Sequence, residues 1–114
     1  MGQINRYFRS IEGGSIAHWC PACHTLHYFP KKPLENGAKW SFNNNFENAT
    51  FTPSMHITVE AFIDDDGTIL CPKEVCHYNL TNHHLIYCGD CTHDLRGKTV
   101  SLPELPAHCR DIVI

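Results

Sequence analysis

The chain has 114 residues, a length that predicts a single domain covering residues 1–114. Charged residues make up only 18% of it and the formal net charge is -3, so the basic surface of a general nucleic-acid binder is not expected. No apolar stretch approaches the roughly 20 residues of a membrane span, and the first residues lack the apolar run of a secretory signal. We therefore expect a cytoplasmic protein with no membrane segment.

Alternating apolar and polar residues, β-branched runs and turn-forming residues predict a chain built from short β-strands. The predicted strands cover residues 15–29 with a turn inside, 39–42, 55–63, 77–80, 84–88 and 99–102. Residues 64–67, three aspartates and a glycine, predict a hairpin turn after the longest strand. Residues 92–96 are expected to form one helical turn ended by Gly97, and no helix of ten residues or more is expected. The predicted fold is a compact, mainly β antiparallel sheet, with a small α+β arrangement as the alternative.

Seven cysteines and nine histidines stand in this short chain, and the cysteine spacing is typical of a metal site. Cys20 with Cys23, and Cys88 with Cys91, both have the C-x-x-C spacing at which a tight turn directs two sulfurs at one ion. Disulfides are less favoured, because the number of cysteines is odd and no signal peptide indicates an oxidising compartment. A redox dithiol is a further alternative. The sequence thus predicts a zinc ion that stabilises a Cys-x-x-Cys knuckle within the sheet.

Three ligand sets fit this prediction, and all of them begin with Cys20 and Cys23. The remaining ligands are Cys88 with Cys91, or Cys91 with one of Cys76 and His77, or a set that includes Cys71. The histidines around the first pair, which are His18, His24 and His27, are expected to support ligands or lie at the surface. Cys109 stands alone and is expected to be a buried free thiol.

Several short motifs between residues 19 and 103 together resemble one family. An aromatic residue precedes the first C-x-x-C pair, followed by Trp40-x-Phe42-Asn43, Thr50-Phe51-Thr52-Pro53-Ser54, Cys76-His77, Asp90-Cys91-Thr92-His93 and Leu95-x-Gly97-x-Thr99-Val100-x-Leu102-Pro103. With these motifs the chain resembles an uncharacterised family of short bacteriophage and bacterial zinc-binding proteins often labelled ammonia monooxygenase. It departs from the family pattern at His24 and Asn44, where glycine is usual.

The resemblance implies a particular metal site. The family's metal-type residues correspond to Cys20, Cys23, Cys76, His77, Cys91 and His93, and Cys88 falls outside the pattern. This favours zinc ligation by Cys20, Cys23, Cys76 and Cys91, with Cys88, His77 and His93 as alternates. The oxygenase label has no support in the residues, since no membrane span is present. Some bacterial relatives lie beside ubiquitin-like conjugation genes, which implies a partner or peptidase role.

Two hypotheses for the function follow. The first is a protein-interaction module with a structural zinc, which binds another protein, a host factor if the chain is phage-encoded. Residues 43–54 are its candidate recognition loop, because they are polar and carry two phenylalanines and a proline. The alternative is a zinc-dependent hydrolase acting on an amide or peptide bond, with His77, Asp90 and His93 as proton-transfer residues. A catalytic pair of Cys76 and His77 is disfavoured, because neighbours on a strand point to opposite faces.

Overall fold

The computed structural model describes residues 2–32, 34, 35, 37 and 39–110. The predicted mainly β fold is confirmed: the described residues form short strands and two short 3-10 helices, with no α-helix. The strands are β1 (Arg9–Ser10), β2 (Ile16–Cys20), β3 (Thr25–Phe29), β4 (Ser41–Phe42), β5 (Phe51–Val59), β6 (Phe62–Ile63), β7 (Ile69–Cys71), β8 (Glu74–Thr81), β9 (His84–Tyr87) and β10 (Thr99–Ser101). The 3-10 helices are η1 (Glu12–Gly14) and η2 (Ala107–Cys109). Neither has the length or apolar character needed to cross a membrane.

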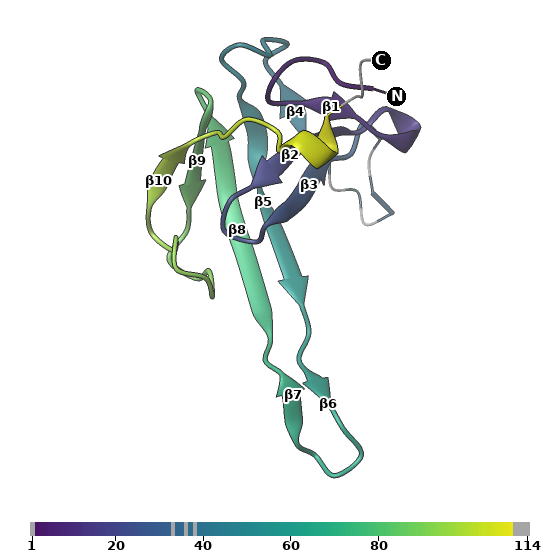
Figure 1. The fold of residues 1–114 in the computed structure, drawn as a ribbon, viewed down its shortest axis with the longest axis vertical. Helices are drawn as coiled ribbons and strands as arrows, with labels where there is room; N and C mark the ends of the chain where they lie inside the picture. The colour runs from purple at the N-terminus through teal and green to yellow at the C-terminus, as the bar shows by residue number, and fades with distance from the viewer. Residues whose placement is uncertain (1, 33, 36, 38, 111–114) are drawn as a thin grey trace.

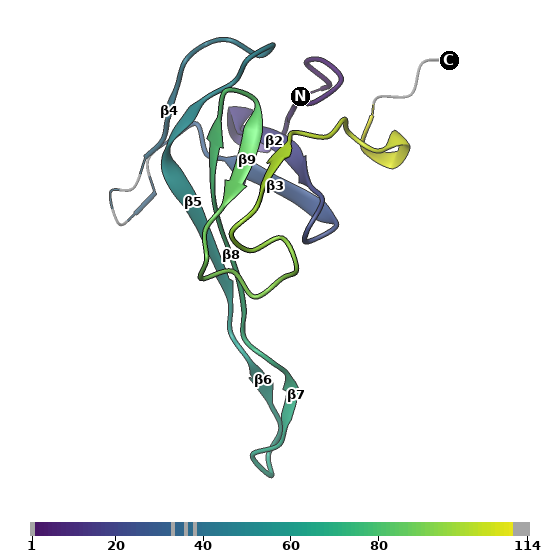
Figure 2. The same ribbon diagram turned by 90° about the vertical axis from the view of Figure 1, so that its left-hand side faces the viewer.

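The strands form three antiparallel sheets (Figure 1). The largest has the order β10-β9-β8-β5-β4, and the second has the order β1-β2-β3. The third contains only β6 and β7, which continue β5 and β8 as an arm that projects from the body (Figure 2). The arm accounts for the long dimension of the molecule, whose extents are 49 × 34 × 30 Å.

Most of the predicted local structure is present. The strand, turn and strand expected over residues 15–29 are β2 and β3, joined by a turn in which His24 has a φ of 54°. The expected strand over residues 55–63 begins earlier, at Phe51, and is divided into β5 and β6. The turn predicted at residues 64–67 joins β6 to β7, where the amide of Gly67 donates to the carbonyl of Asp64.

The expected helical turn at residues 92–96 is wrong. This segment forms two successive turns, in which the amide of Arg96 donates to the carbonyl of His93 and the amide of Lys98 donates to that of Leu95. The start of the segment is held against β8 instead, because the amide of Thr92 donates to the carbonyl of Val75 at 3.0 Å. A helix needs consecutive bonds within its own turns, and the intervening amide of Gly97 donates to the carbonyl of Cys88 instead.

Aromatic side chains fill the space between the two larger sheets. Phe29 of β3 stacks on Phe51 of β5 with ring centroids 4.1 Å apart, and Phe51 stacks in turn on Phe42 of β4 at 4.5 Å. Phe46 packs against the same core. The aromatic residues of the expected recognition loop are therefore core residues, because burying such large apolar rings is strongly favourable.

The two faces of β8 differ completely. Cys76, Tyr78 and Leu80 are buried on the side of the aromatic core. His77 lies between Cys76 and Tyr78 in the chain and is only partly buried. Successive strand residues point to opposite faces, so β8 places a cysteine on one side of the large sheet and a histidine on the other.

Candidate active site and metal cluster

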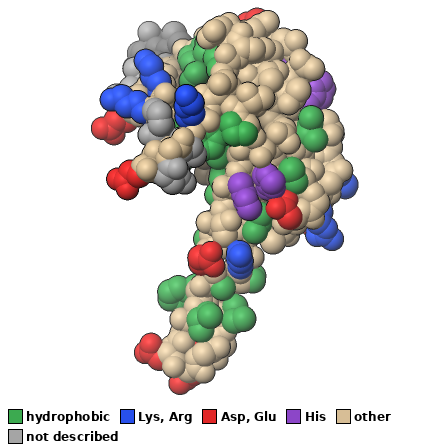
Figure 3. Space-filling model, turned by 180° about the vertical axis from the view of Figure 1, so that it is seen from behind, with side chains coloured by type: hydrophobic (Ala, Val, Ile, Leu, Met, Phe, Trp, Pro, Cys, Tyr) green, Lys and Arg blue, Asp and Glu red, His purple; other side chains and the backbone are tan. Residues whose placement is uncertain are grey.

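Three side chains on the outer face of the large sheet form a hydrogen-bonded relay. The hydroxyl Oγ of Ser54 lies 2.9 Å from Nε2 of His77, and Nδ1 of His77 lies 3.1 Å from both carboxylate oxygens of Asp90. A carboxylate can only accept, so the imidazole donates from Nδ1 and leaves Nε2 free to accept from the serine. Figure 3 shows this side of the molecule, where histidine side chains lie beside an acidic one above the arm. This is the geometry of a Ser-His-Asp triad.

Strand pairing brings Ser54 to His77. In the β5–β8 register, His56 is paired with His77, and Ser54 lies two positions earlier on β5. The register shifts between Phe51 and Met55, and such irregularities redirect side chains beside many active sites. The carbonyl oxygen of Ser54 is held by the indole of Trp40, which donates to it at 3.3 Å.

Asp90 is brought to His77 by the turn after β9. The amide of Cys88 donates to the carbonyl of His77 at 2.8 Å. The sulfur of Cys91 accepts from the amide of His77 at 3.2 Å and donates to its carbonyl at 3.1 Å. These bonds hold the turn against the backbone of His77 both before and after Asp90, so the carboxylate of Asp90 lies beside the His77 ring.

The charges in the triad suit its geometry. The hydrogen bond from His77 holds the pKa of the Asp90 carboxyl below its ordinary value, and the charges of His77 and His56 add to this effect. His56 stacks on His77 with centroids 4.5 Å apart and ring planes 18° from parallel. The His77 side chain is 25% exposed and Asp90 is 51% exposed, so a substrate can reach the relay from solvent. An ionised Asp90 would stabilise a positively charged His77 at this distance.

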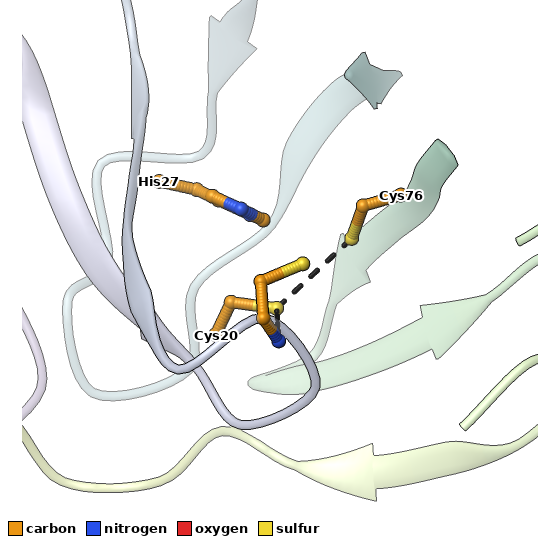
Figure 4. Close-up of side chains that lie close together, drawn as sticks. Cys20, His27 and Cys76 are labelled. Carbon is orange, nitrogen blue, oxygen red and sulfur yellow. Dashed lines mark hydrogen bonds between the residues drawn. The ribbon is translucent and has the colours of Figure 1, made fainter. Parts of the chain in front are cut away.

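A second cluster lies on the inner face of the same sheet (Figure 4). Cys20, Cys23, His27 and Cys76 each offer one ligand atom, and these atoms all lie within 4.8 Å of one another. Cys20 ends β2, Cys23 lies in the turn, His27 lies on β3 and Cys76 comes from β8. The cluster therefore connects the β2–β3 hairpin to the central strand of the large sheet.

The thiols of this cluster influence one another strongly. A hydrogen bond from Cys76 lowers the pKa of Cys20, and the hydroxyl of Tyr87 also donates to the Cys20 sulfur at 3.1 Å. Burial and the nearby Cys20 thiolate raise the pKa of Cys23. The Nδ1 atom of His27 is buried, with no hydrogen-bond partner in the described part of the chain. A cation would neutralise the crowded sulfurs and release the remaining thiol protons.

A comparison with protein families is consistent with the relay of Ser54, His77 and Asp90 on the outer face. The sequence model of the family described as "Bacterial ubiquitination-like system serine protease (BubE)" matches residues 3–88, about three quarters of the chain. The chain belongs to the BubE family. The match includes Ser54 and His77, and Asp90 lies two residues beyond its end. No match was found among curated proteins or solved structures.

Membership in the BubE family corrects the functional hypotheses. The interaction module with a structural zinc is wrong, because the family is described as a serine protease. The zinc-dependent hydrolase does not fit either, since the family's chemistry is assigned to a serine. The ammonia monooxygenase label finds no support, whereas a bacterial family is found as the resemblance indicated. A ubiquitination-like system also indicates protein partners for the family.

The structure brings together some of the predicted metal ligands. Cys20, Cys23 and Cys76 meet, while Cys91 instead contacts the backbone of His77. The alternates Cys88, His77 and His93 do not belong to the cluster of sulfurs.

His27 is the fourth member of this cluster, and the sequence predicted a supporting or surface position for it rather than a place among the ligands. It follows Cys23 by four residues and shares the buried side of β3 with Phe29. That alternation was the sequence signal for its place in the cluster.

Two of the three predicted proton-transfer residues lie together in the BubE-family chain, and the third lies apart. His77 and Asp90 belong to the triad. His93 lies elsewhere: its Nδ1 accepts from the amide of Leu95 and its ring edge contacts Tyr87. Ser54 was missed as a site residue although it ends the motif Thr50-Phe51-Thr52-Pro53-Ser54, because its partner His77 is 23 residues away in the chain.

Proposed function

We propose that this chain is a serine protease that hydrolyses a peptide bond and acts in a bacterial ubiquitination-like system. The observation that carries the proposal is the relay from Ser54 Oγ to His77 Nε2 at 2.9 Å and from His77 Nδ1 to Asp90 at 3.1 Å. The description of the BubE family supports the reaction and a protein substrate.

The relay gives each residue one role. His77 accepts the proton of Ser54 while Oγ attacks the substrate carbonyl carbon, and Asp90 holds the imidazole in the tautomer that allows this transfer. The same proton then passes from His77 to the departing amine as the peptide bond breaks, leaving the acyl group as an ester on Ser54. A water molecule that gives its proton to His77 hydrolyses this ester and restores the serine.

A fluorophosphonate probe tests this proposal, because it reacts with activated serines without needing a peptide sequence. We expect labelling of Ser54, located by peptide mass spectrometry, and a loss of labelling in Ser54→Ala. Peptide hydrolysis should fall by at least about 10⁴-fold, as for other triad deletions. Ser101→Ala is the matched control, since Ser101 is an exposed serine on β10. Labelling that persists in Ser54→Ala, or that lies on another serine, contradicts the proposal.

We further propose that the inner cluster of Cys20, Cys23, His27 and Cys76 holds a structural zinc ion. Three thiolates and one imidazole form a closed tetrahedral donor set of the kind that zinc prefers. The ligand atoms lie within 4.8 Å of one another, which supports a single ion bound by all four side chains. The ion takes no part in catalysis, since Cys76 and His77 point to opposite faces of β8.

The position of this cluster also supports the expected single domain. An ion bound there would join β2 and β3 to β8, and so the second sheet to the sheet that carries the triad. Reduced thiols of this kind are maintained in a reducing cytoplasm, which is the compartment that we propose.

A further inference from the structure

The β5 strand has one edge without a partner strand in the described part of the chain. On one side, β5 pairs with β8 from Met55 to Val59. On the other side, β4 pairs only with Phe51 and Thr52. Figure 1 shows β5 continuing well past β4. The exposed edge therefore begins at Ser54, the proposed nucleophile.

The hydrogen bonds of β8 show which groups face this edge. The carbonyl of His77 accepts from Cys88, and that of Val75 accepts from Thr92, so both residues direct their backbone groups away from β5. Their partners on β5 are His56 and Thr58. In antiparallel pairs, residues that do not bond each other direct their N–H and C=O groups outward. His56 and Thr58 thus present a free backbone ladder to the edge.

A groove lies beside this edge. Its volume is about 380 Å³, and its apolar lining includes Leu26, Tyr28, Leu34, Trp40, Met55 and Ile57. Tyr28 is 50% exposed and Leu34 is 43% exposed. Among the residues that the structure describes, no carboxylate or lysine lines the groove, so its surface suits an apolar side chain.

Free edges of this kind are usually blocked in proteins by prolines, charges or bulges, because they pair with other chains. From Ser54 to Thr58 the edge carries no proline, lysine or acidic residue. An edge that is open, adjoins an apolar groove and begins at the nucleophile is suited to an extended peptide, which supplies the missing strand.

We propose that the substrate binds as an extended strand along the free edge of β5, pairing with His56 and Thr58 and placing an aliphatic or aromatic side chain in the groove. This inference rests on the proposed protease function. Side chains of a bound strand alternate, so every second substrate residue faces the groove and the scissile bond lies at Ser54. The cleaved segment must be a tail or loop that can extend, because a helix cannot pair with the edge.

Two kinds of probe separate this inference from the protease function itself. The first is a small fluorophosphonate, which reports only on the triad. The second is a set of alanine hexapeptide phosphonates in which a single leucine occupies each position in turn. We expect leucine at one position to accelerate reaction with Ser54 by at least about tenfold over alanine. Methylation of the peptide nitrogen that pairs with His56 should abolish this gain in the unmodified protein.

Substitutions at the edge of β5 and in the groove test whether the peptide contacts them. Thr58→Pro removes one outward N–H, and Thr58→Ala is its matched control because it keeps that group. Tyr28→Ser removes an apolar wall, and Ile86→Ser is its control because Ile86 is an exposed apolar residue on β9. We expect Thr58→Pro and Tyr28→Ser to lose the leucine gain and keep fluorophosphonate labelling, while both controls keep both.

The outcomes are distinguishable. If the fluorophosphonate labels Ser54 but no leucine position, N-methylation or variant alters peptide reactivity, the strand-binding inference is overturned and the protease function stands. If the fluorophosphonate does not label Ser54 in the unmodified protein, the protease function fails and this inference fails with it.

Discussion

The two faces of β8 show how one strand can serve two chemistries. Cys76 is 4% exposed and lies in a buried cluster of sulfurs, while the side chain of its neighbour His77 is 25% exposed and contacts Ser54 and Asp90. The inner cluster draws its members from the β2–β3 hairpin and from β8, whereas the outer relay draws one residue each from β5, β8 and the turn after β9. The strand's alternation thus separates a cluster that could hold a metal ion from a hydrogen-bonded relay of three polar side chains.

Because the two sites lie on opposite faces, a substitution in one should leave the other intact. The largest effect, on folding stability, is expected for the inner cluster. Cys76→Ser should remove zinc and unfold the chain, since structural zinc contributes about 10 kcal/mol or more to folding in small domains. His77→Ala should keep the zinc and the fold while hydrolysis is lost. Zinc content by mass spectrometry and thermal unfolding by circular dichroism measure both. Cys71→Ser is the control, because Cys71 is an exposed thiol outside the cluster.

The same measurements decide the fourth ligand. His27→Ala should lose zinc, and Cys91→Ser should retain it, because Cys91 contacts the His77 backbone rather than the cluster. Retention of zinc in His27→Ala with loss in Cys91→Ser would support the ligand set expected from the sequence.

The next largest effect is expected for Asp90, on the outer face. Asp90→Asn leaves the shape of the triad unchanged but removes the charge that fixes the His77 tautomer, so kcat should fall by about 10⁴-fold. Asp94→Asn is the control, since Asp94 is an exposed carboxylate on the following turn. Zinc content should stay unchanged in both variants. A decrease of less than tenfold would show that Asp90 does not orient His77 during the reaction.

The smallest effect concerns pH. The pKa of Asp90 lies below its ordinary 3.8 in the folded chain because of the bond from His77. Its contribution to stability is therefore complete above that ordinary value and is lost as the pH falls through the lowered one. The difference in Tm between the unmodified protein and Asp90→Asn should be fully present at about pH 5 and shrink below about pH 4. A difference that instead grows on acidification would contradict this assignment.

Local patterns were sufficient to predict much of the fold and part of the site. The turn between β2 and β3 that carries Cys23 and the hairpin turn at residues 64–67 depend on neighbours in sequence, and both are present. Ser54 was not predictable, because its contact with His77 depends on a register that shifts between Phe51 and Met55. A strand's side-chain period restricts which residues share a face, but it does not determine which strands become neighbours.

The arm formed by β6 and β7 exposes apolar side chains to solvent, which is energetically unfavourable. Phe62, Ile63, Ile69 and Leu70 are each more than half exposed on two short strands that pair only with each other. Exposed apolar side chains of this kind are unfavourable in water, and an isolated two-stranded sheet is only marginally stable. The tip itself carries Asp64, Asp65 and Asp66, so copies in concentrated solution should associate through the apolar sides of the arm, which light scattering would detect.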